Sequence, residues 1–129
     1  MEYRERKVLI DTNFFLIPHQ FGIDIFTELN NLLDNYAVFV TSTLVINELK
    51  EIAKGKGDDG IAARFAQKLI EKSKIEIVKA EGYTDMWLLT YAKEHNAIVC
   101  TNDVNLKRKL KDAKLKVILL KSKSKIGFV

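Results

Sequence analysis

The sequence predicts a three-layer α/β domain in which helices cover both faces of a parallel five-stranded sheet, and two patterns lead to this class. Short apolar runs rich in valine and isoleucine alternate with longer amphipathic segments along the chain. The short runs are apolar at nearly every position, which is typical of strands that are covered on both faces. Such alternation predicts βαβ units with right-handed crossovers. At 129 residues, we expect one domain over residues 1–129.

The expected strands are short and rich in β-branched residues: they are residues 7–10, 37–40, 75–78, 97–100 and 117–120. The expected helices lie between and after them: they are residues 24–33, 43–54, 60–72, 84–94 and 102–111. Two of these helices share the second crossover and are joined by the glycine-rich residues 55–60. That turn lacks the Gly-Lys-Ser/Thr ending of a phosphate-binding loop, so we expect a flexible connection there.

Composition excludes several classes of protein. Hydrophobic residues make up 47% and charged residues 29% of the chain, as in ordinary soluble domains. No apolar run is long enough to span a membrane, and residues 1–7 do not resemble a signal peptide. The single cysteine, Cys100, cannot form an internal disulfide and lies in an apolar run. We therefore expect a cytoplasmic protein with no membrane partner, in which Cys100 is a buried apolar residue.

The charge of the chain is unevenly distributed. Residues 104–129 contain nine Lys or Arg and one acid, a net charge of +8, whereas residues 1–103 carry a net charge of −4. A basic end on an otherwise acidic chain indicates either a contact with a polyanion beside a cation site or a solvated lysine-rich surface.

Carboxylates occur where expected strands end. Asp11 directly follows the first strand, and Asp103 follows the fourth after two polar residues. Asp85 falls in the first turn of a later helix. Each of these acids could simply cap a helix or complement its dipole. If the first and fourth strands are neighbours, however, Asp11 and Asp103 meet at the carboxyl edge of the sheet, where α/β proteins place their chemistry.

A fourth acid is predicted from a helical pattern. In residues 43–54 the apolar stripe is formed by Val45, Ile46, Leu49, Ile52 and Ala53. At about 100° per residue, Glu48 lies about 40° beyond the edge of this stripe, whereas Glu51 points to solvent. Glu48 could be a surface glutamate, but its position also suits a side chain that reaches into a cleft.

Together these four acids predict a cation site. Carboxylates that lie close together repel one another and raise their own pKa values unless cations neutralise them. Hard oxygen ligands select Mg²⁺ or Mn²⁺. Such a site suits the hydrolysis of a phosphodiester by metal-activated water.

The acidic segments resemble the four acidic motifs of PIN-domain ribonucleases. They are LIDTN (9–13), VINEL (45–49), TDMWL (84–88) and VCTND (99–103). The segment PHQFGIDIF (18–26) and the basic end resemble the archaeal branch related to ribosomal-RNA-processing PIN nucleases. The resemblance implies a sheet in the order 3-2-1-4-5 and cleavage of RNA that depends on Mg²⁺ or Mn²⁺.

The resemblance also assigns roles to residues. It implies that Asp11, Glu48, Asp85 and Asp103 are catalytic metal ligands, and that Thr101 and Asn13 orient carboxylates or water. Many relatives carry a second Asp just after the third acid, whereas this chain has Met86 at that position. PIN relatives often dimerise, so the resemblance also implies a possible homodimer.

The acids alone would repel RNA, so we expect cations near them to hold phosphates. The expected RNA-binding residues are Lys107, Arg108, Lys109 and Lys111. Trp87 and Tyr91 could stack on bases, but on an apolar helix we expect them in the core.

The function that we expect is a metal-dependent endoribonuclease that acts in ribosomal-RNA processing. The alternatives are the toxin ribonuclease of a toxin–antitoxin pair and a non-catalytic RNA-binding PIN scaffold in ribosome assembly. A phospho-acceptor receiver domain also places acids at strand ends, but it needs an acceptor Asp after the third strand. The sequence there is VKAE (78–81), which argues against that class.

Overall fold

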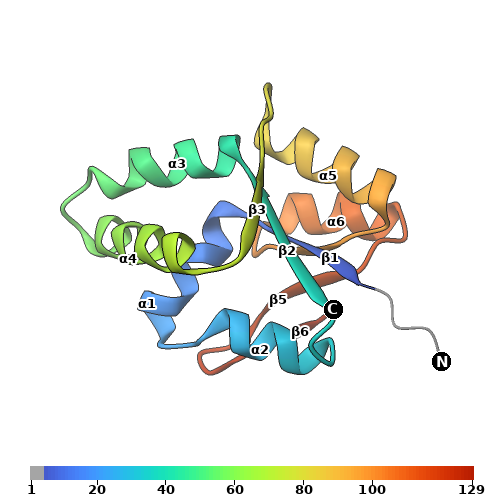
Figure 1. Cartoon of the computed structure of the whole chain (residues 1–129), viewed down its shortest axis with the longest axis horizontal. Coiled ribbons are helices and arrows are strands. Elements are labelled where there is room, and N and C mark those ends of the chain that lie inside the picture. The colour runs from blue at the N-terminus through green and yellow to red at the C-terminus, as the bar shows by residue number, and fades with distance from the viewer. Residues whose placement is uncertain (1–4) are drawn as a thin grey trace.

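A six-stranded sheet forms the centre of the molecule in a computed structural model, which describes residues 5–129 (Figure 1). Its strands are β1 (Arg6–Ile10), β2 (Ala37–Ser42), β3 (Ile75–Val78), β4 (Ile98–Cys100), β5 (Val117–Ser122) and β6 (Lys125–Phe128). The sheet has the order β3-β2-β1-β4-β5-β6, and its first five strands are parallel. The predicted parallel sheet and its order 3-2-1-4-5 are therefore confirmed.

The strand β6 was not predicted from the sequence. It returns antiparallel to β5 through a short hairpin and forms one edge of the sheet. Its four residues include one lysine and one glycine, and only Ile126 and Gly127 are buried. The apolar run that marks a doubly covered strand is therefore missing.

The helical elements include the five that were predicted, together with two additional ones. They are η1 (Thr12–Leu16, a 3₁₀ helix), α1 (Ile17–Phe21), α2 (Ile25–Leu32), α3 (Thr43–Ala53), α4 (Asp58–Lys72), α5 (Thr84–His95) and α6 (Val104–Asp112). The sequence missed η1 and α1 because five consecutive residues, 14–18, are all buried, which leaves no helical period to detect. Within residues 5–129 no helix has both the length and the apolar character needed to cross a bilayer.

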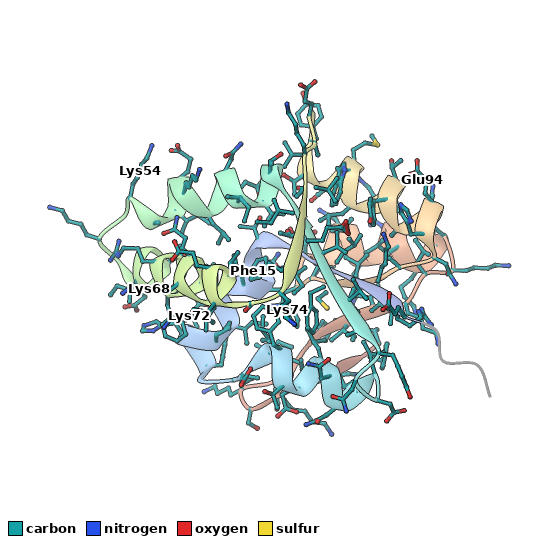
Figure 2. The ribbon with its side chains drawn as sticks, viewed as in Figure 1. Phe15, Lys54, Lys68, Lys72, Lys74 and Glu94 are labelled. Atoms are coloured by element: carbon teal, nitrogen blue, oxygen red, sulfur yellow. The ribbon has the colours of Figure 1, made fainter. Side chains whose placement is uncertain are left out.

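Two hydrophobic cores lie on opposite faces of the sheet, because successive side chains of a strand point to opposite faces. On one face Leu9, Val40 and Val99 pack against α5 and α6. On the other face Val8, Ile10 and their neighbours pack against η1, α2, α3 and α4. Figure 1 shows the two helical groups on either side of the strands, and Figure 2 shows Phe15 in the interior while Lys54, Lys68 and Glu94 lie on the outer helices.

The predicted burial of Cys100 is confirmed, whereas Trp87 and Tyr91, which were expected in the core, are only partly buried. Cys100 is fully buried in β4, and burial raises the pKa of its thiol, so it acts as an apolar residue. Trp87 and Tyr91 are half-buried and pack on the core beneath α5. The centroids of their rings lie 4.9 Å apart.

The glycine-rich turn between α3 and α4 is a close backbone contact. A Cβ atom on Gly60 would lie 2.1 Å from the carbonyl oxygen of Gly55. Arg64 also donates to the carbonyls of Ala53 and Gly55, at 2.6 and 2.9 Å. The turn that was expected to be a flexible connection is therefore tied to α4.

Candidate functional site

The ends of β1 and β4 bring two of the predicted acids to the same edge of the sheet. The two strands pair in parallel, with Ile10 opposite Cys100. The pairing continues one residue further, because the N–H of Asp11 donates to the carbonyl of Cys100 at 3.0 Å. Asp11 follows β1 directly and Asp103 follows β4 after two residues. The site was predicted on the condition that the first and fourth strands are neighbours in the sheet, and the structure meets this condition.

Asp11 is buried but keeps hydrogen bonds to both carboxylate oxygens. Its side chain is part of the interior, with only 5% of the residue exposed. Oδ1 accepts from the N–H of Thr12 at 2.7 Å, and Oδ2 accepts from the hydroxyl of Thr101 at 2.7 Å. Burial raises the pKa of Asp11 to about 6; these two hydrogen bonds oppose the rise, and the charges of Asp85 and Glu48 add to it.

Asp103 lies in a loop that Thr101 and Asn13 hold in place. The hydroxyl of Thr101 accepts from the N–H of Asp103 at 3.1 Å while it donates to Asp11. Asn13 accepts from the N–H of Asn102 at 3.0 Å. The carboxylate of Asp103 accepts from the N–H of Leu106 at 3.0 Å and caps α6. From the sequence, Asp103 could either cap a helix or lie at the carboxyl edge of the sheet. In the structure it does both.

Glu48 reaches the site from α3. One oxygen accepts a short hydrogen bond from the hydroxyl of Thr12, and the other accepts from the hydroxyl of Thr84 at 2.7 Å. Glu51 instead forms an exposed ion pair with Lys54 at 2.8 Å. The helical argument therefore separated the two glutamates correctly, because only Glu48 reaches across to the strand end.

Asp85 interacts electrostatically with two of the other acids. It lies in the first turn of α5, beside Thr84. Partial burial raises the pKa of Asp85, the charges of Asp103 and Glu48 raise it further, and the charge of Lys109 lowers it. Each of the four predicted acids therefore acts on at least one of the others, and the structure brings all four to one region.

Thr12 and Thr84 are site residues that sequence reasoning missed. Thr12 connects two acids, because its N–H donates to Asp11 and its hydroxyl donates to Glu48. Thr84 ties the start of α5 to Glu48. Each threonine is next to an acid in the sequence, in Asp11-Thr12 and Thr84-Asp85, and this adjacency was the available signal.

The basic residues of α6 divide into distinct environments. Lys109 is exposed and acts on Asp85 through its charge. Lys111 donates to the carbonyl of Val129 at 3.1 Å, away from the acids. Lys107 is half-buried, and Arg108 is exposed. The structure thus associates one of the four predicted RNA-binding residues, Lys109, with the acidic site.

The chemistry of the four acids, though not their arrangement, suits a hard divalent cation. The four acids offer oxygen ligands, and mutual repulsion contributes to the raised pKa values of Asp11 and Asp85. Over residues 5–129, no group of three or more His, Cys, Asp or Glu side chains is already arranged to hold a metal ion. The carboxylate oxygens of Asp11 and Glu48 instead accept hydrogen bonds from threonine hydroxyls.

Comparisons with known proteins agree with this fold. The chain is 30% identical over 122 residues to ribonuclease VapC9 of Archaeoglobus fulgidus, covering 94% of this chain and 87% of that protein. It is 31% identical over 121 residues to ribonuclease VapC4 of Methanocaldococcus jannaschii, covering 91% and 92% of the two chains.

Two solved structures share the architecture. The PIN domain endonuclease Utp24 superposes with a TM-score of 0.79 at 26% identity, covering 95% of this chain and 90% of that one. VapBC2 from Rickettsia felis, solved on a DNA fragment from its promoter, gives a TM-score of 0.60 at 18% identity, covering 88% and 98%. The sequence also matches the family described as "PIN like domain" over residues 8–123, and the chain belongs to this family.

Proposed function

We propose that the protein is an endoribonuclease that hydrolyses RNA phosphodiester bonds with the help of Mg²⁺ or Mn²⁺. The observation that carries the proposal is the set of four acids at one sheet edge, connected by Thr12, Thr84 and Thr101. The names of the two archaeal relatives, both ribonucleases, support the same reaction.

The chain would hold the cation through Asp11 and Asp103, and Glu48 and Asp85 would complete the ligand set. When bound, a divalent ion polarises water and neutralises charge on the phosphate. The protein's own part is to fix the carboxylates: Thr101 orients Asp11, and Thr12 and Thr84 orient Glu48. Hydrogen bonds to ligand carboxylates of this kind tune the ligands and limit their motion. Asn13 has a different part, because it holds the backbone of the loop that carries Asp103.

The raised pKa of Asp11 is consistent with this role. A carboxylate that is buried among other acids has a higher free energy when it is ionised, and a nearby divalent cation relieves that cost.

The test is RNA cleavage by the purified protein. We expect cleavage in Mg²⁺ or Mn²⁺, no cleavage in EDTA, and no cleavage by Asp11→Asn, whose amide keeps the shape but loses the charge. Glu51→Gln is the matched control, because Glu51 lies on the same helix and its carboxylate forms an exposed ion pair with Lys54. Cleavage by Asp11→Asn at the wild-type rate, after contamination is excluded, would refute the assignment.

The biological substrate that we propose is a ribosomal-RNA precursor, in the cytoplasm. The resemblance of residues 18–26 and of the basic end to ribosomal-RNA-processing PIN nucleases supports this choice. A second candidate is the toxin ribonuclease of a toxin–antitoxin pair, which the VapC names of the two relatives support. Two experiments distinguish them. Sequencing of RNA crosslinked to the protein in cells supports processing if the reads are enriched at a ribosomal-RNA maturation site. Growth arrest when the protein is expressed alone, relieved by a partner protein, supports the toxin.

A non-catalytic RNA-binding scaffold is the remaining alternative. Metal-dependent cleavage by the purified protein would exclude it.

We propose a homodimer as the oligomeric state of the nuclease. Sedimentation of the purified chain tests the dimer directly.

A further inference from the structure

Three exposed apolar side chains lie beside the acids, and we call them the apolar rim: Tyr83, Met86 and Val104. Tyr83 directly precedes Thr84, whose hydroxyl donates to Glu48. Met86 directly follows Asp85, and Val104 directly follows Asp103. In Figure 1 the loop that precedes α5 rises above the first turns of α3 and α5.

The exposure of the rim distinguishes it from the remaining surface. Tyr83, Met86 and Val104 are 83%, 63% and 71% exposed, and every other exposed large hydrophobic residue among residues 5–129 is at most 46% exposed. The three most exposed large apolar side chains of the described chain thus all belong to residues that are next to candidate site residues in the sequence. Isolated exposed apolar residues are common on proteins, but a group at the edge of a polar site indicates a binding surface.

Tyr83 is the N-cap residue of α5, and it serves the helix through its backbone, because its carbonyl accepts from the N–H of Trp87 at 3.0 Å. It precedes α5 in extended conformation, and its side chain makes no hydrogen bond that caps the helix. The preceding residue, Gly82, has a positive φ of 96° and turns the chain just before the tyrosine. An aromatic ring that is almost fully in water and lies beside a phosphodiester site has the form of a stacking surface for a base.

We propose that Tyr83 stacks on an unpaired base of the RNA next to the cleaved phosphate, and that Met86 and Val104 extend this apolar contact. The inference rests on the proposed nuclease function and names its substrate class, RNA with unpaired nucleotides at the cleavage site. Bases inside an A-form duplex are covered by their neighbours and cannot stack on a side chain. Stacking also adds attraction that does not depend on charge, where four carboxylates repel the phosphates.

The experiment measures RNA binding separately from cleavage. All variants carry Asp11→Asn to prevent turnover, and the probe is a short single-stranded oligouridylate that contains 5-iodouridine. We expect irradiation to crosslink the probe to Tyr83, identified by mass spectrometry of the peptide. We expect Tyr83→Ala to raise the Kd for this probe by about 5- to 100-fold, the equivalent of one stacked base.

Two variants and a second probe serve as controls. Tyr83→Phe keeps the ring and should retain the affinity of the parent protein for the probe. Phe21→Ala removes a 38% exposed ring from α1 and should leave this affinity unchanged. A duplex of related sequence should bind equally well to the parent protein and to Tyr83→Ala. Because Tyr83 is 83% exposed, its substitution should leave the melting temperature unchanged.

Each outcome decides between the two proposals. Equal affinity of Tyr83→Ala and its parent for the single strand, or crosslinks confined to other residues, would overturn the stacking role and leave the rim to a protein partner. Failure of the parent protein to bind single-stranded RNA would overturn it too. If the protein with Asp11 intact cleaves no RNA in Mn²⁺ while the crosslink and the Kd change are observed, the nuclease proposal fails and the stacking role of Tyr83 stands.

Discussion

The hydroxyl of Thr101 donates a 2.7 Å hydrogen bond to Oδ2 of Asp11, and it thereby connects the ends of β4 and β1. The same hydroxyl accepts from the N–H of Asp103 at 3.1 Å. Thr101 is fully buried, so water cannot replace either bond. One side chain therefore orients Asp11 and positions the backbone of Asp103, and it lowers the pKa of Asp11 against the effect of burial.

Replacing Thr101 with valine should impair the site without unfolding the protein. The change keeps the shape of the side chain but leaves Asp11 Oδ2 and the N–H of Asp103 without this partner. We expect the free energy of unfolding to fall by about 1–3 kcal/mol, and the affinity for Mn²⁺ to fall by about 10- to 100-fold. Urea unfolding and calorimetric titration with Mn²⁺ measure the two effects. Thr101→Ser, which retains the hydroxyl, should keep most of the affinity; equal affinities of the valine and wild-type proteins would contradict the proposed role.

The ionisation of Asp11 should make the metal-free protein less stable as the pH rises. The folded pKa of about 6 exceeds the unfolded value of 3.8, so the folded state binds the proton more tightly. The stabilisation from this proton is therefore full below the unfolded pKa and is lost as the pH rises through about 6. At about 1.36 kcal/mol per pKa unit, the loss amounts to about 3 kcal/mol.

Asp11→Asn isolates this contribution, because the other titrating groups are common to both proteins. In EDTA, the difference in free energy of unfolding between variant and wild type should shift in favour of the variant by about 2.4 kcal/mol between about pH 4 and about pH 8, which is most of the full effect. Urea unfolding at a series of pH values measures the shift. A difference that stays constant with pH would show that Asp11 titrates alike in the folded and unfolded states.

Much of the fold and part of the site could be predicted from the sequence. Strands that are covered on both faces are visible as apolar runs, so β1 to β5 were found, and the stripe of α3 separated Glu48 from Glu51. The edge strand β6 and the buried segment of η1 and α1 carry no such period, so they were missed. Thr12 and Thr84 were missed for a different reason: a threonine beside an acid becomes a site residue only when the fold brings Glu48 to it.

The close contact between Gly60 and Gly55 should not tolerate even a methyl group. A Cβ atom on Gly60 would lie 2.1 Å from a backbone oxygen, which no side-chain movement can relieve. We expect Gly60→Ala to lower the free energy of unfolding by about 1–3 kcal/mol or more, the range seen for overpacked sites. Gly57→Ala is the matched control in the same turn, since a Cβ atom there meets nothing within 4 Å. Thermal unfolding of both variants tests the contact, and equal melting temperatures would show that the turn is not packed as described.

Lys109 should carry an RNA contact that Lys111 does not. Lys109 acts on Asp85 through its charge, whereas Lys111 donates to the carbonyl of Val129 near the other end of α6. If Lys109 neutralises a phosphate, Lys109→Gln should flatten the salt dependence of binding to single-stranded RNA by about 0.7 in log–log slope. The loss of affinity should be similar for all RNA sequences, because phosphates are common to all of them. A salt titration of RNA affinity with the Asp11→Asn protein measures the slope, and Lys111→Gln in the same background is the control. Unchanged slopes in both variants would mean that these two lysines only form a solvated surface, and that the RNA path crosses a different part of the protein.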